Sequence, residues 1–171
     1  MRKLSLEELG RMSPEEFQSA RKLPVTVVLD NIRSAHNVGS IFRTADAFAV
    51  ERLILCGITA QPPHREIHKT AIGATESVEW KYVESVENAV KDLIKRGYTL
   101  IIAEQTDQSI PLDHLEVKDD DKLALIVGNE VEGVSDAVLT YAGQSVEIPQ
   151  YGTKHSFNVA VSAGILRLFS V

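Results

Sequence analysis

The sequence has a single cysteine and no long apolar run, and these absences exclude several classes of protein. Cys56 can form no internal disulfide, and its place at the end of the apolar run 53–55 predicts a buried small side chain without nucleophilic chemistry. The longest uninterrupted apolar runs, such as 123–127, are far shorter than the roughly 20 residues that cross a bilayer. The N-terminus, "MRKLSLEELG", interrupts its leucines with acids and shows neither a secretory h-region nor a transit peptide. We therefore expect a cytoplasmic protein that does not span a membrane.

Two common enzyme fingerprints are also missing. The loop 128–135, "GNEVEGVS", has the pattern G-x-E-x-x-G and not the dinucleotide pattern G-x-G-x-x-G. The segment "KHSFN" at 154–158 lacks the G-x-S-x-G elbow of serine hydrolases, and no triad acid is evident. A nicotinamide enzyme and a serine hydrolase are therefore disfavoured. We also expect no metal site.

Positive charge is not in excess over the whole chain. Eighteen Lys and Arg against 24 Asp and Glu give a net charge of −6, which argues against a surface with general affinity for nucleic acid. Locally the balance differs, because residues 31–69 hold five Lys or Arg and three acids, and 152–158 holds Lys154 and His155 without any acid. This pattern predicts a basic face on an acidic protein.

The length of the chain predicts one domain, at 23–171, after a short helical leader at 1–22. In the leader, four apolar residues at helical spacing are Leu4, Leu6, Leu9 and Met12. Ser13, Pro14 and Glu16 then form the pattern of a capping box. We expect two short helices there, or one broken helix.

Apolar strand-like runs alternate with helical periodicity along the rest of the chain. The expected strands are 25–29, 52–56, 78–83, 98–104, 122–128 and 144–149, and the expected helices are 38–45, 85–96, 135–142 and 156–169, with a possible further helix in 64–74. This order predicts a single-domain α/β fold with a mostly parallel sheet flanked by helices. Ligands of such sheets bind at the carboxyl ends of strands, so we expect one site built from the loops 31–43, 128–135 and 149–158.

Each of these loops, taken alone, also has a purely structural interpretation. Gly128 and Gly133 suit a tight turn in which backbones approach closely, with Ser135 as a helix cap. Ser156 suits the cap of a final helix whose apolar stripe is Phe157, Val161, Ile165 and Leu168. Arg43 follows core-like Phe42, so its guanidinium either reaches solvent or points into a site.

Together, the loops carry three ordered motifs. They are N-x-G-x-x-x-R-T-A at 37–45, G-x-E-x-x-G at 128–133 and I-P-x-x-G-x-x-x-S-x-N-V-x-V at 148–161. Over about residues 25–169 the chain resembles the SpoU (TrmH-like) branch of the SPOUT RNA 2′-O-ribose methyltransferases. Two departures are visible, since Phe157 stands where the family usually has Leu and Ala49 where it often has Gly.

The resemblance implies the following site residues. The active-site positions are Asn37, Arg43, Glu130, Ser156 and Asn158. The positions that hold S-adenosylmethionine are Gly128, Ile148 and Phe157, with Glu104 and Gln105 at the end of a preceding strand. It also implies a C-terminal trefoil knot and a homodimer, in which Val161, Ile165 and Phe169 serve either the core or the interface.

The same resemblance implies an RNA substrate, with transfer RNA ahead of ribosomal RNA. The expected RNA-binding residues are Arg33, Arg65, Lys69 and Lys154, with His64 and His68 beside them. His36 and His155 lie beside the motifs and are expected to contact RNA or solvent. A non-enzymatic alternative is an RNA-binding or assembly factor that kept the fold and lost transfer.

The family's proposed base, Arg43, is energetically unfavourable. A guanidinium titrates near 12.5 or above, so deprotonating it at pH 7 costs at least ~7.5 kcal/mol. We expect Arg43 instead to grip an RNA phosphate, while phosphate oxygen or water takes the proton. Asn37, Ser156 and Asn158 would orient the ribose and the arginine. Glu130 would fix the residues around them.

Overall fold

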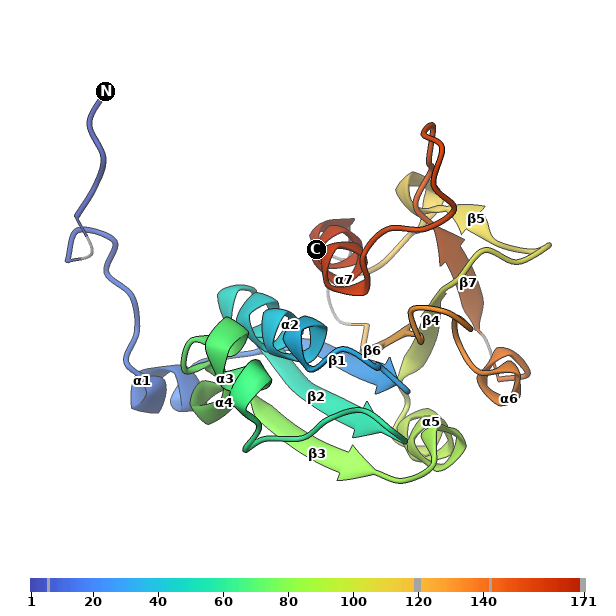
Figure 1. The fold of residues 1–171 in the computed structure, drawn as a ribbon, viewed down its shortest axis with the longest axis horizontal. Helices are drawn as coiled ribbons and strands as arrows, with labels where there is room; N and C mark the ends of the chain where they lie inside the picture. The colour runs from blue at the N-terminus through green and yellow to red at the C-terminus, as the bar shows by residue number, and fades with distance from the viewer. Residues whose placement is uncertain (6, 119–120, 142, 170–171) are drawn as a thin grey trace.

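The computed structural model describes residues 1–5, 7–118, 121–141 and 143–169 (Figure 1). For residues 167–169 it describes the backbone only. Its centre is a seven-stranded sheet in the order β3-β2-β1-β6-β4-β7-β5, and every strand pairing in it is parallel. The strands are β1 (Leu23–Asp30), β2 (Val50–Cys56), β3 (Glu79–Val83), β4 (Thr99–Ala103), β5 (Ile110–Pro111), β6 (Leu123–Val127) and β7 (Gln144–Glu147). The predicted α/β class with a parallel sheet is confirmed. The trefoil knot stays a prediction of the family resemblance.

Helices cover both faces of the sheet (Figure 1). They are α1 (Pro14–Ser19), α2 (Ala35–Ala47), α3 (Arg65–Ala71), α4 (Ala74–Ser77), α5 (Val86–Lys95), α6 (Asp136–Leu139) and α7 (Val159–Phe169), with a 3-10 turn η1 (Leu112–His114). Side chains from α2, α3, α4 and α7 share one core cluster with alternate residues of β1, such as Val27 and Leu29. Side chains from α5 and α6 form the other cluster with Val28. The central strands are thus buried on both faces, which explains their nearly continuous apolar runs.

Helix α2 explains the first motif in part by packing. Val38, Ile41, Phe42 and Ala45 are buried along one stripe, as predicted. A Cβ on Gly39 would lie 2.1 Å from Oγ1 of Thr70 and 2.4 Å from the carbonyl oxygen of residue 67. Glycine at this position therefore allows α2 and α3 to pack closely.

The turn after α2 contains the departure at Ala49. Phe48 ends the helix, and Ala49 follows with a φ of 48°, in the left-handed region that helices usually fill with glycine. An L-residue there costs about 1–2 kcal/mol. The left-handed backbone thus explains the family's frequent glycine, and this chain adopts the same conformation with alanine.

Some predicted elements differ from the structure. Residues 7–10 form a turn and not a helix, because Gly10 has a φ of 56° and Leu4, Leu9 and Met12 stay exposed, leaving nothing to stabilise so short a helix. The capping box of Ser13 and Glu16 on α1 is confirmed. Between β4 and β6, where the sequence predicts no strand or helix, the chain forms β5 and η1. Cys56 is buried as expected, and burial raises the pKa of its thiol to about 12. None of the helices, over the part of the chain described, is long and apolar enough to cross a membrane.

Candidate functional site

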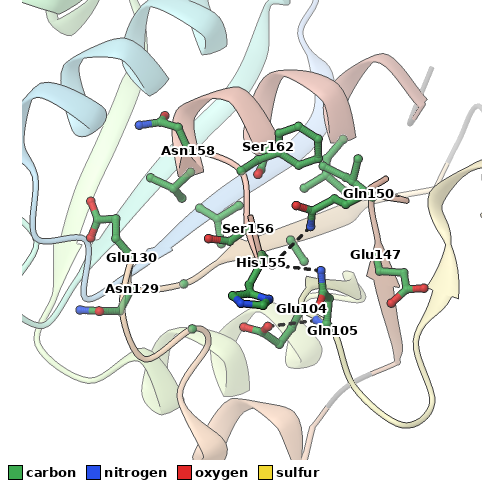
Figure 2. A pocket seen from close by; sticks show the side chains of 18 of the residues that line it. Glu104, Gln105, Asn129, Glu130, Glu147, Gln150, His155, Ser156, Asn158 and Ser162 are labelled. Carbon is green, nitrogen blue, oxygen red and sulfur yellow. Dashed lines mark hydrogen bonds between the residues drawn. The ribbon is translucent and has the colours of Figure 1, made fainter. Parts of the chain in front are cut away.

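The loops that follow β4, β6 and β7 meet around a cavity at the carboxyl ends of these strands. Its volume is about 590 Å³, within the range typical of cofactor pockets. Glu130 and Asn158 lie toward one side, Glu147 and Gln150 toward the other, and Ser156 and His155 lie between them (Figure 2). The predicted convergence of the second and third loops on one site is therefore observed.

A chain of side-chain hydrogen bonds joins all three motifs. Asn37 donates from Nδ2 to Oε1 of Glu130 over 2.8 Å, and its Oδ1 accepts from Nδ2 of Asn158 over 3.0 Å. Glu130 also accepts from the backbone N–H groups of Arg33 (2.9 Å) and Ser34 (3.2 Å). These hydrogen bonds connect Asn37 to Glu130, which is 93 positions away in the sequence, and to Asn158, which is 121 positions away.

Glu130 is held as a carboxylate by its donors. Partial burial alone would raise its pKa, but hydrogen bonds from the Arg33 N–H, the Asn37 amide and the Ser34 N–H together lower the pKa below its ordinary value. The carboxylate therefore stays ionised at neutral pH and keeps the Asn37 amide in one orientation.

Asn158, and not Ser156, caps the last helix. Oδ1 of Asn158 accepts from the backbone N–H groups of Ala160 (2.9 Å) and Val161 (3.4 Å), so α7 begins at Val159. The prediction that Ser156 caps this helix is wrong, and so is the placement of Phe157 in its stripe, because both precede the helix. Ser156 and Phe157 line the cavity instead. The side chain of Leu168 lies outside the described residues.

Close backbone approaches shape the floor of the cavity. A Cβ on Gly128 would lie 2.3 Å from the backbone of Gly133 and Val134, as the motif glycines predicted. Glu104 accepts from the N–H of Val134 over 2.9 Å through Oε2, and a Cβ on Gly133 would lie 2.3 Å from that oxygen. Glu104 therefore braces the second loop as well as lining the cavity.

The walls suit a cationic ligand with an apolar part. Four carboxylates line them, those of Glu104, Glu130, Glu132 and Glu147. No Lys or Arg stands among the described lining residues. Ile148, Phe157 and Leu166 supply apolar surface. This lining fits the sulfonium, ammonium and adenosine groups of S-adenosylmethionine, and it is unsuited to the phosphates of a dinucleotide. All five predicted cofactor residues, including Gln105, belong to it.

Arg43 lies outside the cavity. It is exposed on α2, six residues after Asn37, which is ~9 Å along the helix axis. Within the described part of the chain, no hydrogen bond or ion pair holds its side chain. Of the two alternatives for this residue, the structure shows the guanidinium reaching solvent.

The predicted RNA-binding residues fall into separate groups. Arg65 and Lys69 lie on α3, where Glu66 pairs with Lys69 (2.8 Å), with Arg65 (4.0 Å) and with His36. Lys154 lies in the β7–α7 loop, which is on the other side of α2 from α3 in Figure 1. Arg33 is exposed just before α2. The basic face is thus divided, and Glu66 offsets part of the charge on α3.

Several cavity residues were not anticipated from the sequence. Glu132, Glu147, Gln150 and Ser162 line the cavity without having been singled out. Glu147 and Gln150 flank the start of the third motif, and Ser162 follows Asn158 by one helical turn. Their positions relative to the motifs are the signal that could have found them.

Comparisons with known proteins agree with this site. The SpoU rRNA Methylase family matches residues 24–167. The tRNA (guanosine(18)-2′-O)-methyltransferase of Aquifex aeolicus is 32% identical over 155 residues, 88% of this chain and 70% of that protein. The 23S rRNA (guanosine-2′-O-)-methyltransferase RlmB of Neisseria meningitidis is 32% identical over 143 residues, 84% of this chain and 56% of that protein.

Solved structures give the same result. The crystal structure of the A. aeolicus TrmH/SpoU tRNA modifying enzyme superposes with a TM-score of 0.80 at 25% identity, covering 92% of this chain and 78% of that one. The AdoMet-bound rRNA methyltransferase from Sinorhizobium meliloti superposes with a TM-score of 0.81 at 26% identity, covering 94% of this chain and 60% of that one. The chain belongs to the SpoU rRNA methylase family.

Proposed function

We propose that this protein transfers the methyl group of S-adenosylmethionine to a ribose 2′-hydroxyl of RNA, with transfer RNA the leading substrate and ribosomal RNA the second. The observation that carries the proposal is the hydrogen-bonded chain of Asn37, Glu130 and Asn158 at the wall of an acidic cavity. The relatives named for tRNA and 23S rRNA 2′-O-methylation support both RNA classes. Such a substrate also implies a cytoplasmic protein.

The cavity residues would hold the methyl donor. Ile148 and Phe157 would cover the adenosine, Gly128 would leave room for it, and Glu104 and Gln105 would lie at its polar edge. When bound, S-adenosylmethionine supplies an electrophilic methyl group on a positively charged sulfur. Water exclusion and orientation are then the tasks of the protein, since positioning supplies much of the rate of such a transfer.

Asn37 would position the ribose hydroxyl. Its Nδ2 carries two hydrogens, and Glu130 engages one of them. The other can donate to the 2′-oxygen and stabilise the negative charge that develops there. Asn158 fixes the other end of the Asn37 amide, and Ser156 lines the cavity as a further donor.

Arg43 would bind RNA from outside the cavity. Its exposed guanidinium can grip the phosphate beside the target ribose in bidentate fashion, and a phosphate oxygen or water can take the proton. This arrangement avoids the cost of a neutral arginine and keeps positive charge away from the sulfonium.

The exposed β7–α7 loop would supply base recognition. Residues 151–158 are all exposed and contain no acid, and Tyr151 is 97% exposed. RNA sequence is usually read from unstacked bases on aromatic side chains, so Tyr151 would stack on a base while Lys154 contacts a phosphate. Arg33, Arg65 and Lys69 would bind more distant phosphates.

A homodimer and a division of the chain complete the proposal. Val161 is 50% exposed on α7 and would pair with a second copy, whereas Ile165 packs partly on the core. The side chain of Phe169 lies outside the described residues. Residues 1–22 would form a leader to the catalytic domain at 23–171.

The purified chain tests the proposal directly. It should bind S-adenosylmethionine in calorimetry and transfer a labelled methyl group to the tRNA or rRNA of a strain that lacks the gene, yielding 2′-O-methylnucleosides by mass spectrometry. Cofactor binding without transfer to either RNA would favour the RNA-binding alternative. Failure to bind the cofactor would refute the proposal.

Arg43 provides the decisive variant. Arg43→Ala should abolish transfer in single-turnover assays while calorimetry shows unchanged cofactor binding, because the side chain lies outside the cavity. Arg96→Ala, an exposed arginine at the end of α5, is the matched control and should retain transfer. Retained activity in Arg43→Ala would contradict the assigned role.

A further inference from the structure

Two adjacent polar residues outside the three motifs, Asp30 and Asn31, are the last residue of strand β1 and the residue that follows it. Asp30 is fully buried, and within the described residues no ion pair joins it to a Lys, Arg or His. Asn31 has a φ of 56°. A buried carboxylate without a cation is costly unless hydrogen bonds satisfy it, so its partners indicate what it does.

The carboxylate of Asp30 accepts two hydrogen bonds. Oδ2 accepts from the backbone N–H of Ser135 over 2.7 Å, and Oδ1 accepts from Nδ2 of Asn31 over 2.8 Å. Oδ1 of Asn31 in turn accepts from the backbone N–H of Ile58 over 3.1 Å. The Asp30 side chain therefore only accepts hydrogen bonds, whereas the Asn31 side chain donates one and accepts one.

Asn31 also holds the other end of the second loop. The backbone carbonyl oxygen of Asn31 accepts a hydrogen bond from Nδ2 of Asn129 over 2.8 Å. Oδ1 of Asn129 accepts from the backbone N–H groups of Val131 (2.8 Å) and Glu132 (3.1 Å). The segment 129–135 is thus tied to the end of β1 at both of its ends, with Glu130 between the ties.

We propose that Asp30 and Asn31 are positioning residues for methyl transfer. By holding segment 129–135 they set the place at which the Glu130 carboxylate meets Asn37 and the backbone of Arg33. The inference rests on the proposed function. Neither side chain lines the cavity, so their effect on transfer passes through the segment that they hold, which carries Glu130.

The chemistry of the pair predicts a reciprocal pattern of variants. Asp30→Asn places an amide where two donors already point, so one of them loses its acceptor. Asn31→Asp sets two carboxylates against each other. The double exchange, Asp30→Asn with Asn31→Asp, restores one donor between two acceptors, and an oxygen remains for each of the N–H groups of Ser135 and Ile58.

The experiment measures kcat, KM for RNA, the Kd of S-adenosylmethionine and Tm, using the tRNA and rRNA of a strain that lacks the gene. Each single variant should lower kcat at least tenfold, well below its Tm, with less than a threefold change in cofactor Kd. The double exchange should return kcat to within about threefold of the wild type. Asp136→Asn, an exposed carboxylate beside Ser135, is the matched control and should change nothing.

A less buried position guards against simple unfolding. Asn129→Asp keeps the oxygen for Val131 and Glu132 but loses the donor to Asn31, and it should lower kcat by a similar factor. Wild-type kcat in either single variant, or a double exchange as slow as the singles, would overturn the positioning role alone. A wild-type chain that binds cofactor but methylates neither RNA would overturn the proposed function.

Discussion

The loops 128–135 and 148–158 wall the same cavity but are held very differently. The first is tied to Asp30, Asn31 and Glu104, and its own backbone forms a bridge between Asn129 and Gly133 through two 2.9 Å hydrogen bonds. In the second, eight consecutive residues are exposed. Apart from the contacts of Asn158, it is held by 3.5 Å hydrogen bonds from Gln105 and Gln150 to the carbonyl oxygen of His155.

The difference divides the work of the site. Local stability follows the density of buried contacts, so the loop 128–135 is the rigid wall that orients Asn37, and the loop 148–158 is free to adapt. A rigid wall suits the cofactor and the reacting atoms, which tolerate little displacement. An exposed, acid-free loop suits an RNA whose bases must be accommodated as it docks.

The largest effect is expected from one glycine of the loop 128–135. Gly128→Ala places a methyl group 2.3 Å from the backbone of Gly133 and Val134, which cannot move without breaking the tie to Glu104. We expect cofactor binding to be lost and the free energy of unfolding to fall by at least about 2 kcal/mol, as for overpacked sites. Calorimetry and urea denaturation measure both.

A glycine of the loop 148–158 is the control for that variant. A Cβ on Gly152 would meet no atom within 4 Å, and its φ is not positive. Gly152→Ala should therefore leave cofactor affinity and stability nearly unchanged, although both glycines belong to motifs. Equal losses in the two variants would break the distinction between the loops.

The next effect concerns the charge of the rigid wall. Glu130→Gln offers an amide to donors that now meet a carboxylate, so kcat should fall about a hundredfold, the size typical of a lost charge-stabilising group. The pKa of Glu130 is lowered from 4.5, so its ionised form is complete above that value and is lost only as the pH falls through the lower, folded pKa.

The kcat profile of both proteins checks this assignment. The ratio of the wild-type kcat to the Glu130→Gln kcat should stay constant from pH 5 to 8 and should fall only below about pH 4.5. A ratio that changes near pH 7 would show that a different group is responsible.

The smallest effect is expected in the adaptable loop. Tyr151→Leu should raise KM for RNA about tenfold through a lost base stack, at constant kcat and cofactor Kd, whereas Tyr151→Phe should behave as the wild type. Leucine keeps apolar area but lacks the aromatic ring, and phenylalanine keeps the ring but lacks the hydroxyl. The two variants therefore distinguish the contribution of the ring from those of apolar area and of the hydroxyl. A Tyr151→Leu variant with normal KM would leave the loop without a role in base recognition.

Local signals predicted most of the elements. The strand at 123–127, the helix capped by Ser85 and closed by Gly97, and the stripe of α2 each depend on periodicity and caps within a few residues. The predicted start of α7 was wrong. Ser156 and Asn158 are both good helix caps, and the choice between them depends on the contact of Asn158 with Asn37, which is distant in the sequence. The possible helix at 64–74 is confirmed as α3, which packs closely against α2 at Gly39.

The sequence by itself determined the α/β alternation, the three motif loops and the types of side chain that they bring to the strand ends, because these follow from local patterns. Only the tertiary structure decided that Glu130 holds Asn37, that Asp30 and Asn31 tie the loop 128–135, that Arg43 faces solvent and that the basic residues are divided. These contacts join residues about a hundred positions apart. The order in which parallel strands pair fixes which loops are neighbours, and no local pattern encodes that order.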